Sequence, residues 1–488
     1  MNKNTLQDLV KGKYGRKIAY ANVEEVDQSN ILEVVGETLG IFYFNKQIIK
    51  YLWDYYKGDH PIRYRKKIVR DDIVNKIVEN HAYEIVQFKT GQTYGEPIQF
   101  ISKKDDEKIN KGVDELNDYL ADANKHEKDI KGGEWQSAVG TSFRAVQFSG
   151  DSEIPFRIVA PSPMNTYIIY SSITEEPLVA VQELKDIDGE FYKVCYTKSH
   201  QCILKNGKVE KWELHAFGDI PIIEYPNNHE RISDIELVID LMDAIDNMQS
   251  NRMDSIEQFV QSWVKFVNCT VDPETFQKMK LEGALVVKSN NGTDNKADVD
   301  IMTQELNQSQ SQVAKDDLWD NAQIILAIPN RNNNNTGGDT QGAIQLRNGW
   351  DEAKNRTIIK DPLIRTSEKR LAKVVLNILR ITGNDLGITL RDFSVQINHS
   401  PTDNMVVKCQ SLQYLLECGI HPLIAIKTVG LWGDAEKVFM ISRDYLDNLW
   451  KKIGDAEEQE AKAQELLDNM NQNQNQNSNG NKTPEVEE

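Results

Sequence analysis

The sequence predicts an α+β fold that is mainly α-helical, and three observations carry this prediction. Two long stretches, residues 233–267 and 308–328, place apolar side chains at helical spacing. Residues 139–224 instead contain short β-branched and aromatic runs separated by Gly, Pro, Asp and Asn. The composition, with 39% hydrophobic and 27% charged residues, is that of a globular protein.

The first part of the chain is predicted to be an arm followed by three helices. Residues 1–35 have little pattern and are predicted to be irregular, with one short helix. Amphipathic helices are predicted over 41–57, 72–89 and 108–125, and a strand is predicted over 97–101. The β-rich stretch that follows is predicted to be a small antiparallel region, with hairpin turns at Asp188-Gly189 and Asn206-Gly207.

A long helix and its return are the dominant helical feature. Ser233-Asp-Ile-Glu236 is a capping box, which predicts a helix from there to Val267 with a length of about 50 Å. Its apolar stripe is narrow, so a neighbouring helix is needed to cover it. We expect residues 308–328 to supply that neighbour, after a small α/β tip over 268–307 with strands near 284–288 and 299–302.

The stretch from Ile328 to Ala343 interrupts the helices with four consecutive asparagines and a Gly-Gly pair. Such residues do not suit a packed helix, so the stretch is predicted to be a polar loop. A helix is predicted after it, with a break at Pro362. Beyond residue 382 we expect one strand over 389–397 and helices over 403–418, 422–430 and 434–469, followed by a disordered Asn/Gln-rich end.

Two charged stretches are predicted to be solvated surfaces. Residues 63–70 form a basic cluster, but acidic residues follow at once. Several aspartates of the long helix have a spacing that we interpret as a water-facing surface rather than a two-metal site, namely Asp234, Asp240, Asp243, Asp246 and Asp254. The net charge of -18 argues against non-specific binding of nucleic acid.

No catalytic residue, metal site or cofactor is predicted. The sequence has no phosphate-binding loop, no His-Glu-x-x-His and no Gly-x-Ser-x-Gly. Its five cysteines have no metal-ligand spacing and are predicted to be buried thiols. No apolar run is long enough to span a membrane and no signal peptide is recognised, so we expect a soluble protein of intracellular origin.

The sequence resembles the portal proteins, or head-to-tail connectors, of tailed bacteriophages, above all the portal proteins of long-tailed phages from Gram-positive hosts. The likeness covers about residues 40–450. It is carried by the order of several local motifs, which lie at 55–58, 75–98, 163–170, 240–247 and 328–343. In the last of these, Gln341 stands where the family usually has Ser at the start of the next helix.

The resemblance implies a ring of about twelve subunits around a DNA channel at one vertex of the capsid in the virion, assembled in the host cytoplasm. It implies a portal fold in which the segments have named roles. These are an N-terminal arm (1–39), a wing (40–232), a stem (233–267 and 308–328), a clip (268–307), a tunnel loop (329–340), a kinked wing helix (341–382), a helical crown (383–454) and an acidic tail (455–488).

The implied partners are other copies of the chain, the terminase motor, a head-completion adaptor, the major capsid and scaffold proteins, and double-stranded DNA. No membrane is involved. The implied DNA-contacting residues are those of the tunnel loop, Arg331, Asn332, Asn333, Asn334 and Asn335. The implied partner surface of the clip comprises Asp272, Glu274, Lys278, Lys280 and Lys288.

Three alternatives remain open from the residues alone. The Asn-rich stretch fits a surface loop with an incidental arginine. The helices would also suit another ring or scaffold protein of the capsid without a DNA-lined channel. A DNA-processing enzyme would require the aspartates of the long helix to act as a carboxylate cluster.

Overall fold

The computed structural model describes residues 14–68, 71–103, 106–151, 153–260, 263–267, 274, 277, 298–302, 308–330, 349–399, 405–431, 435, 438–443 and 445. Within these ranges the fold is α+β and mainly helical, as predicted. The chain divides into two compact units, Met1–Ser400 and Pro401–Glu488. No described helix combines the length and apolar composition of a membrane span.

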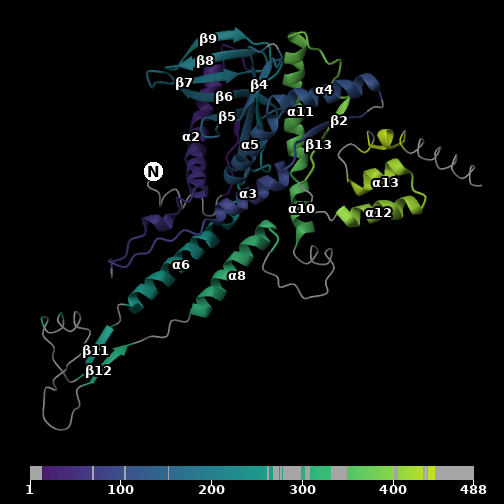
Figure 1. Cartoon of the computed structure of the whole chain (residues 1–488). Coiled ribbons are helices and arrows are strands. Elements are labelled where there is room, and N and C mark those ends of the chain that lie inside the picture. Colours follow the sequence, from purple (N-terminus) through teal and green to yellow (C-terminus); the bar gives the residue numbers. More distant parts are fainter. Residues whose placement is uncertain are drawn as a thin grey trace, which may run out of the picture. The chain divides into compact units, whose positions relative to one another are not determined.

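The first unit contains a six-stranded sheet in the order β1-β5-β6-β7-β8-β9 (Figure 1). Its first pair is parallel and its other pairs are antiparallel. Turns with positive φ at Gly189, Asn206 and Gly207 confirm both predicted hairpins. The strands are β1 (Ala19–Ala21), β5 (Thr166–Ser171), β6 (Pro177–Lys185), β7 (Phe191–Tyr196), β8 (His200–Lys205) and β9 (Lys208–Leu214).

Two smaller antiparallel sheets accompany it. One has the order β10-β3-β4, from strands β10 (Ile222–Pro226), β3 (Thr141–Phe148) and β4 (Phe156–Val159). The other sheet pairs β13 (Phe393–Gln396) with β2 (Gln99–Ser102). Strand β13 is shorter than the strand predicted over 389–397. An apolar cluster that includes Ala145 and Ile222 of the three-stranded sheet and Ile168 and Ala180 of the large sheet packs these two sheets together.

Helices cover these sheets and supply most of the core. They are α2 (Ile31–Tyr56), α3 (His81–Tyr94), α4 (Glu107–Asp122), α5 (Lys125–Val139), α10 (Trp350–Ile358) and α11 (Asp361–Ile381). The α11 helix begins with Pro362 in its first turn, and residues 359 and 360 separate it from α10, so the predicted break is confirmed.

Two N-terminal predictions are wrong. Helix α2 starts at Ile31, so residues 31–35 belong to a long helix and not to an irregular arm. The helix predicted over 72–89 starts only at His81, because the side chain of Asn80 accepts a hydrogen bond from the Tyr83 amide and caps it there. Residues 71–80, hereafter the strap, have no regular secondary structure.

A buried ionic network joins α5, α11 and the three-stranded sheet. Arg144 is fully buried and donates from Nε to Asp129 at 3.0 Å, while Lys125 reaches both Asp129 and Glu368. The Tyr225 hydroxyl donates to Glu368 at 3.1 Å. These contacts pair two cations with two carboxylates, which offsets the cost of burying them.

The predicted long helix and its return are present, but the long helix begins and ends at other residues than predicted. After a short 3-10 turn, η2 (Glu236–Val238), helix α6 (Ile239–Val260) lies beside α8 (Gln308–Leu326) (Figure 1). The helix does not continue to Val267, because Trp263–Val267 forms strand β11, which pairs with β12 (Asp298–Met302). The predicted strand near 299–302 is thereby confirmed, whereas 284–288 lies outside the described residues.

The second unit is described over two helices and a few further helical residues. They are α12 (Met405–Glu417) and α13 (Pro422–Val429), close to the two helices predicted there. Lys408 Nζ donates to the Gly430 carbonyl at 3.0 Å and ties the end of α13 to α12. Of the helix predicted over 434–469, residues 435, 438–443 and 445 are described and are helical.

Candidate functional site: the polar seam along helix α6

The predicted site residues fall almost entirely outside the part of the chain that the structure describes. This holds for Arg331 and Asn332 to Asn335, and for Asp272, Lys278, Lys280 and Lys288. Of both sets only Glu274 is described, as an exposed helical residue. The DNA-contacting loop and the clip surface therefore stay predictions.

What the structure does describe is the long helix pair, and here the sequence interpretation was wrong in one respect. Of the five aspartates that we expected to face water, Asp240 is exposed, whereas Asp234, Asp243, Asp246 and Asp254 are buried. Four of the buried polar side chains belong to α6. These are Asp243, Asp246, Ser250 and Asp254, which we call the α6 seam. Every one of them accepts hydrogen bonds from the chain between Tyr55 and Glu79.

Alternate residues of the strap donate their amides to successive turns of the seam. The Glu79 amide donates to Asp246 at 2.7 Å, the Ile77 amide to Ser250 at 3.0 Å, and the Asn75 amide to Asp254 at 2.7 Å. Two residues of extended chain span about 6.6 Å and one helical turn rises about 5.4 Å, so the two spacings nearly match. The strap runs antiparallel to α6, because its residue numbers fall as those of the seam rise.

Cations at one end of the seam neutralise Asp254. Lys67 donates to its carboxylate, and Arg65 lies 3.6 Å from it. Burial would raise the pKa of Asp254, but the contacts with Lys67 and Asn75 outweigh burial and lower it. Two residues of the basic cluster that was predicted to be a solvated surface patch thus contact the seam.

The other end of the seam meets a histidine and a tyrosine. His60 is fully buried, and its Nδ1 lies 2.5 Å from Asp246. The Tyr55 hydroxyl donates to Asp243 at 3.0 Å, and the two rings stack with centroids 3.8 Å apart. Burial, reinforced by the nearby Asp243, raises the pKa of Tyr55 well above its ordinary value, so this phenol stays protonated.

The predicted capping-box contact between Ser233 and Glu236 is present, but helix α6 begins only at Ile239, after the η2 turn. The Ser233 amide donates to Glu236 at 2.8 Å, and the Ile235 amide donates to Ser233 Oγ at 3.0 Å. The sequence did not indicate that both side chains are fully buried, or that Arg16 pairs with Glu236. This end of the helix is fixed to the N-terminal segment and to α5, whose Ala138 carbonyl accepts from Ser233 Oγ.

Two cations fix the end of α8, immediately before the predicted loop. Lys89 Nζ lies 2.5 Å from the Leu326 carbonyl, and Arg356 of α10 donates to the Ile325 carbonyl at 2.7 Å. Burial lowers the pKa of Lys89 to about 8. Ala327 has a φ of 50°, the left-handed conformation in which helices commonly end. Because Arg356 lies beyond the loop in sequence, it holds the two flanks of the loop together.

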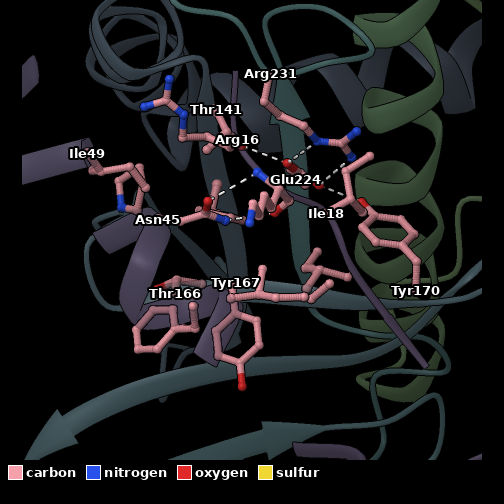
Figure 2. Close-up of a pocket in the computed structure, with 17 residues that line it drawn as sticks. Arg16, Ile18, Asn45, Ile49, Thr141, Thr166, Tyr167, Tyr170, Glu224 and Arg231 are labelled. Carbon is pink, nitrogen blue, oxygen red and sulfur yellow. Dashed lines mark hydrogen bonds and ion pairs between the residues drawn. The ribbon is translucent and has the colours of Figure 1, made fainter. Parts of the chain in front are cut away.

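A second polar cluster lines a small cavity between α2 and the sheets (Figure 2). The Glu224 carboxylate accepts from Arg231, Tyr170 and Thr141, and Asn45 bonds both backbone groups of Lys17. Burial would raise the pKa of Glu224, but Arg231 outweighs burial and lowers it. The cavity of about 40 Å³ suits water molecules rather than an organic ligand, so we interpret this cluster as structural.

No group of three or more potential metal ligands occurs among the described residues. The seam residues were missed because each aspartate was judged alone. A usable signal was present, namely polar residues of α6 at intervals of three and four.

Buried polar contacts along α6 from Asp243 to Asp254 fix the long helix pair to the α/β body, an arrangement that serves structure. The comparisons with known proteins agree. The family model described as "Phage portal protein, SPP1 Gp6-like" matches residues 45–415, well over half of the chain. The chain belongs to this family of phage portal proteins.

Three solved structures were also compared. The neck of an empty gene transfer agent particle, computed with C6 symmetry, is 10% identical, with a TM-score of 0.46, and the match covers 72% of this chain and 90% of that chain. The virion of a native gene transfer agent particle and the neck of a native one have the same identity and coverage, with TM-scores of 0.44 and 0.41. No curated protein matches the sequence. Because the TM-scores are low, the family match alone carries the assignment.

The resemblance to portal proteins is therefore confirmed. A portal protein is a structural component of the virion and a head-to-tail connector, not an enzyme, and it acts as a homo-oligomeric ring. The enzyme alternative is thereby set aside. Three of the aspartates it would require, Asp243, Asp246 and Asp254, are used by the α6 seam.

Proposed function

We propose that this chain forms a ring of about twelve subunits whose central channel carries double-stranded DNA into and out of the capsid. The observation that carries the proposal is the antiparallel pair of α6 and α8, joined at one end to the α/β body and continued at the other by the β11–β12 ribbon. Membership of the portal family supports a ring made from this unit.

The proposed roles of the segments follow the predicted division, with a changed stem boundary. The wing comprises 40–232 and the kinked helix 341–382, and the crown comprises 383–454. The stem is formed by α6 and α8. Because α6 ends at Val260 and β11 begins at Trp263, we assign the β11–β12 ribbon to the base of the clip and extend the clip from 268–307 to 263–307.

The clip is proposed to dock the terminase motor during packaging and a head-completion adaptor afterwards. Major capsid and scaffold proteins would contact the ring from outside. We further propose that the phage is of the long-tailed type from a Gram-positive host, and that the ring assembles in the host cytoplasm. The sequence motifs that resemble portals of such phages support this finer assignment.

The loop after α8 is proposed to contact DNA in the channel. Arg331 is the one charged side chain between Ile328 and Gly338, and a ring of such residues would form weak phosphate contacts. Affinity for DNA rises with each phosphate that is neutralised, so a mostly uncharged loop in an acidic protein favours sliding over tight binding. The cationic anchors at Leu326 and Ile325 support this proposal by fixing where the loop begins.

Deleting Asn332 to Asn335 tests the DNA-contacting role. We expect rings of normal size that package or retain less DNA, because the loop no longer reaches the channel axis. DNA content per head is measured after assembly with the variant portal. The matched control deletes Gln472 to Asn475, four uncharged amide residues (two Gln and two Asn) in the tail. Normal DNA-filled heads from the loop deletion would contradict the role.

A further inference from the structure

Two cysteines lie opposite each other inside the large sheet. Cys195 of β7 and Cys202 of β8 are register partners, and both are buried. They occupy the middle of a row that crosses four strands, between Val181 of β6 and Trp212 of β9. Both are free thiols.

The backbone ladder indicates how far apart they are. The Thr197 amide donates to the His200 carbonyl at 2.9 Å, so residues 197 and 200 form a hydrogen-bonded pair. Such pairs recur at every second residue of an antiparallel ladder, which makes 195 and 202 another one, with Cα atoms about 5.5 Å apart. Disulfides most often join Cα atoms about 5.5–6 Å apart. The sheet therefore already holds both residues at disulfide distance.

The two facing thiols also influence each other's ionisation. A hydrogen bond between the side chains raises the pKa of Cys195 and lowers the pKa of Cys202. Cys202 lies on β8, next to the edge strand β9, and is therefore nearer the open side of the sheet than Cys195. We assign it as the attacking thiol, and the thiolate is its reactive form.

We propose that Cys195 and Cys202 are a redox-responsive pair that closes into an intrachain disulfide when it meets a small disulfide oxidant such as oxidised glutathione. The Cys202 thiolate attacks one sulfur of the oxidant and releases one glutathione thiolate. Cys195 then loses its proton and attacks the Cys202 sulfur, which releases the second. The pair gives up two protons and two electrons, and the oxidant becomes two glutathione molecules.

The consequence is a covalent link across the outer half of the sheet. Thiols stay reduced inside most cells, whereas disulfides persist outside them. A virion component meets both conditions, so the link would form after release. This consequence rests on the virion location, whereas the chemistry of the pair does not.

The test uses the full chain with Cys269, Cys409 and Cys418 replaced by serine, which leaves only the pair. Samples reduced beforehand and samples oxidised beforehand with diamide are brought to equilibrium in the same glutathione buffers. They are then denatured, alkylated with iodoacetamide and weighed by mass spectrometry. In buffer dominated by oxidised glutathione we expect both samples to lose about 2 Da and to carry no alkyl group.

Cys195→Ala in the same background is the control. It leaves Cys202 without a partner, so we expect a glutathione adduct or an alkylated thiol in place of the mass loss. Two alkylated cysteines from both starting samples of the paired protein, or a lasting glutathione adduct on it, would overturn the proposal. Ring formation is recorded for every sample, so a failed portal assignment is distinguished from a failed redox pair.

Discussion

Asp246 is the residue that best represents the α6 seam. It is fully buried and accepts from the Glu79 amide, with His60 beside its other oxygen. A buried carboxylate is tolerated only where such partners are present. Removing the Asp246 carboxylate leaves its buried donors without an acceptor. The resulting loss in free energy of unfolding is larger than the net contribution of the hydrogen bonds themselves.

We predict that Asp246→Ala lowers the free energy of unfolding by about 2–4 kcal/mol. Glu257→Ala is the matched control, because Glu257 is an exposed acid on the same helix, and it should change the free energy by less than about 0.5 kcal/mol. Urea denaturation of both variants measures the difference. Equal stability of the two variants would contradict the importance of the seam.

His399 gives the first unit a pH dependence near its C-terminal end. Its Nε2 lies 3.1 Å from Asp361, and its Nδ1 lies 3.2 Å from the Gln92 carbonyl. Burial would lower the pKa of His399, but Asp361 outweighs burial and raises it, while Lys354 opposes the rise. Arg365 also pairs with Asp361 and competes for the same carboxylate.

Because the folded-state pKa is raised, the stabilisation is fully present below the unfolded value of about 6.5 and is lost as pH rises through the folded value. We predict faster amide exchange of residues 393–399 as pH increases across this window, after correction for the intrinsic rate. His399→Gln should remove the extra pH dependence. An unchanged profile in that variant would assign the effect to another group.

At the scale of elements, the strap and α6 depend on each other. The strap has no regular structure, and α6 would expose buried carboxylates without it. Three strap amides donate to the seam, and Lys315 of α8 adds a contact with Glu79 at 3.1 Å. The strap therefore joins both helices of the pair to the α/β body.

Ser250→Ala tests this dependence without changing a charge. It leaves the Ile77 amide without its acceptor, so we predict faster hydrogen exchange in a peptide covering 73–80, by about tenfold if the lost bond is worth about 1.4 kcal/mol. Exchange in α11 should stay the same. Glu257→Ala again serves as control. Unchanged exchange in 73–80 would mean that the strap is held by other contacts.

Local signals made some elements predictable. The Ser233 and Glu236 capping box and the two hairpin turns depend on residues close in sequence, and all three are present. The end of the long helix was not predictable in this way. Residues 263–267 are apolar and aromatic and suit either structure, and their partner strand lies about thirty residues further on.

The candidate site was predictable only in part for the same reason. The chain showed where a narrow helix stripe occurs, and the covering helix is found where expected. The predicted polar loop lies largely outside the described residues and stays a prediction. It did not show that Asn75, Ile77 and Glu79 meet the seam, because that pairing joins segments about 170–180 residues apart. Each aspartate taken alone resembles a surface residue.

At the scale of the whole molecule, charge and fold agree with a conduit for DNA. The chain carries a net charge of -18, so an unspecific grip on phosphates is disfavoured. The helix pair, held by the seam, the capping box and the two cations at the end of α8, is a stiff unit that a ring could repeat. The family assignment gives this arrangement its function.

Electron microscopy of the purified full-length protein tests the central claim most directly. We predict closed rings with a central hole, about twelve subunits around it, and the α6–α8 pair of every subunit lining the passage. Subunit number is read from top views and from mass measurements of the same sample. A uniform population of monomers at high protein concentration, or rings in which α6 and α8 lie away from the hole, would contradict the account.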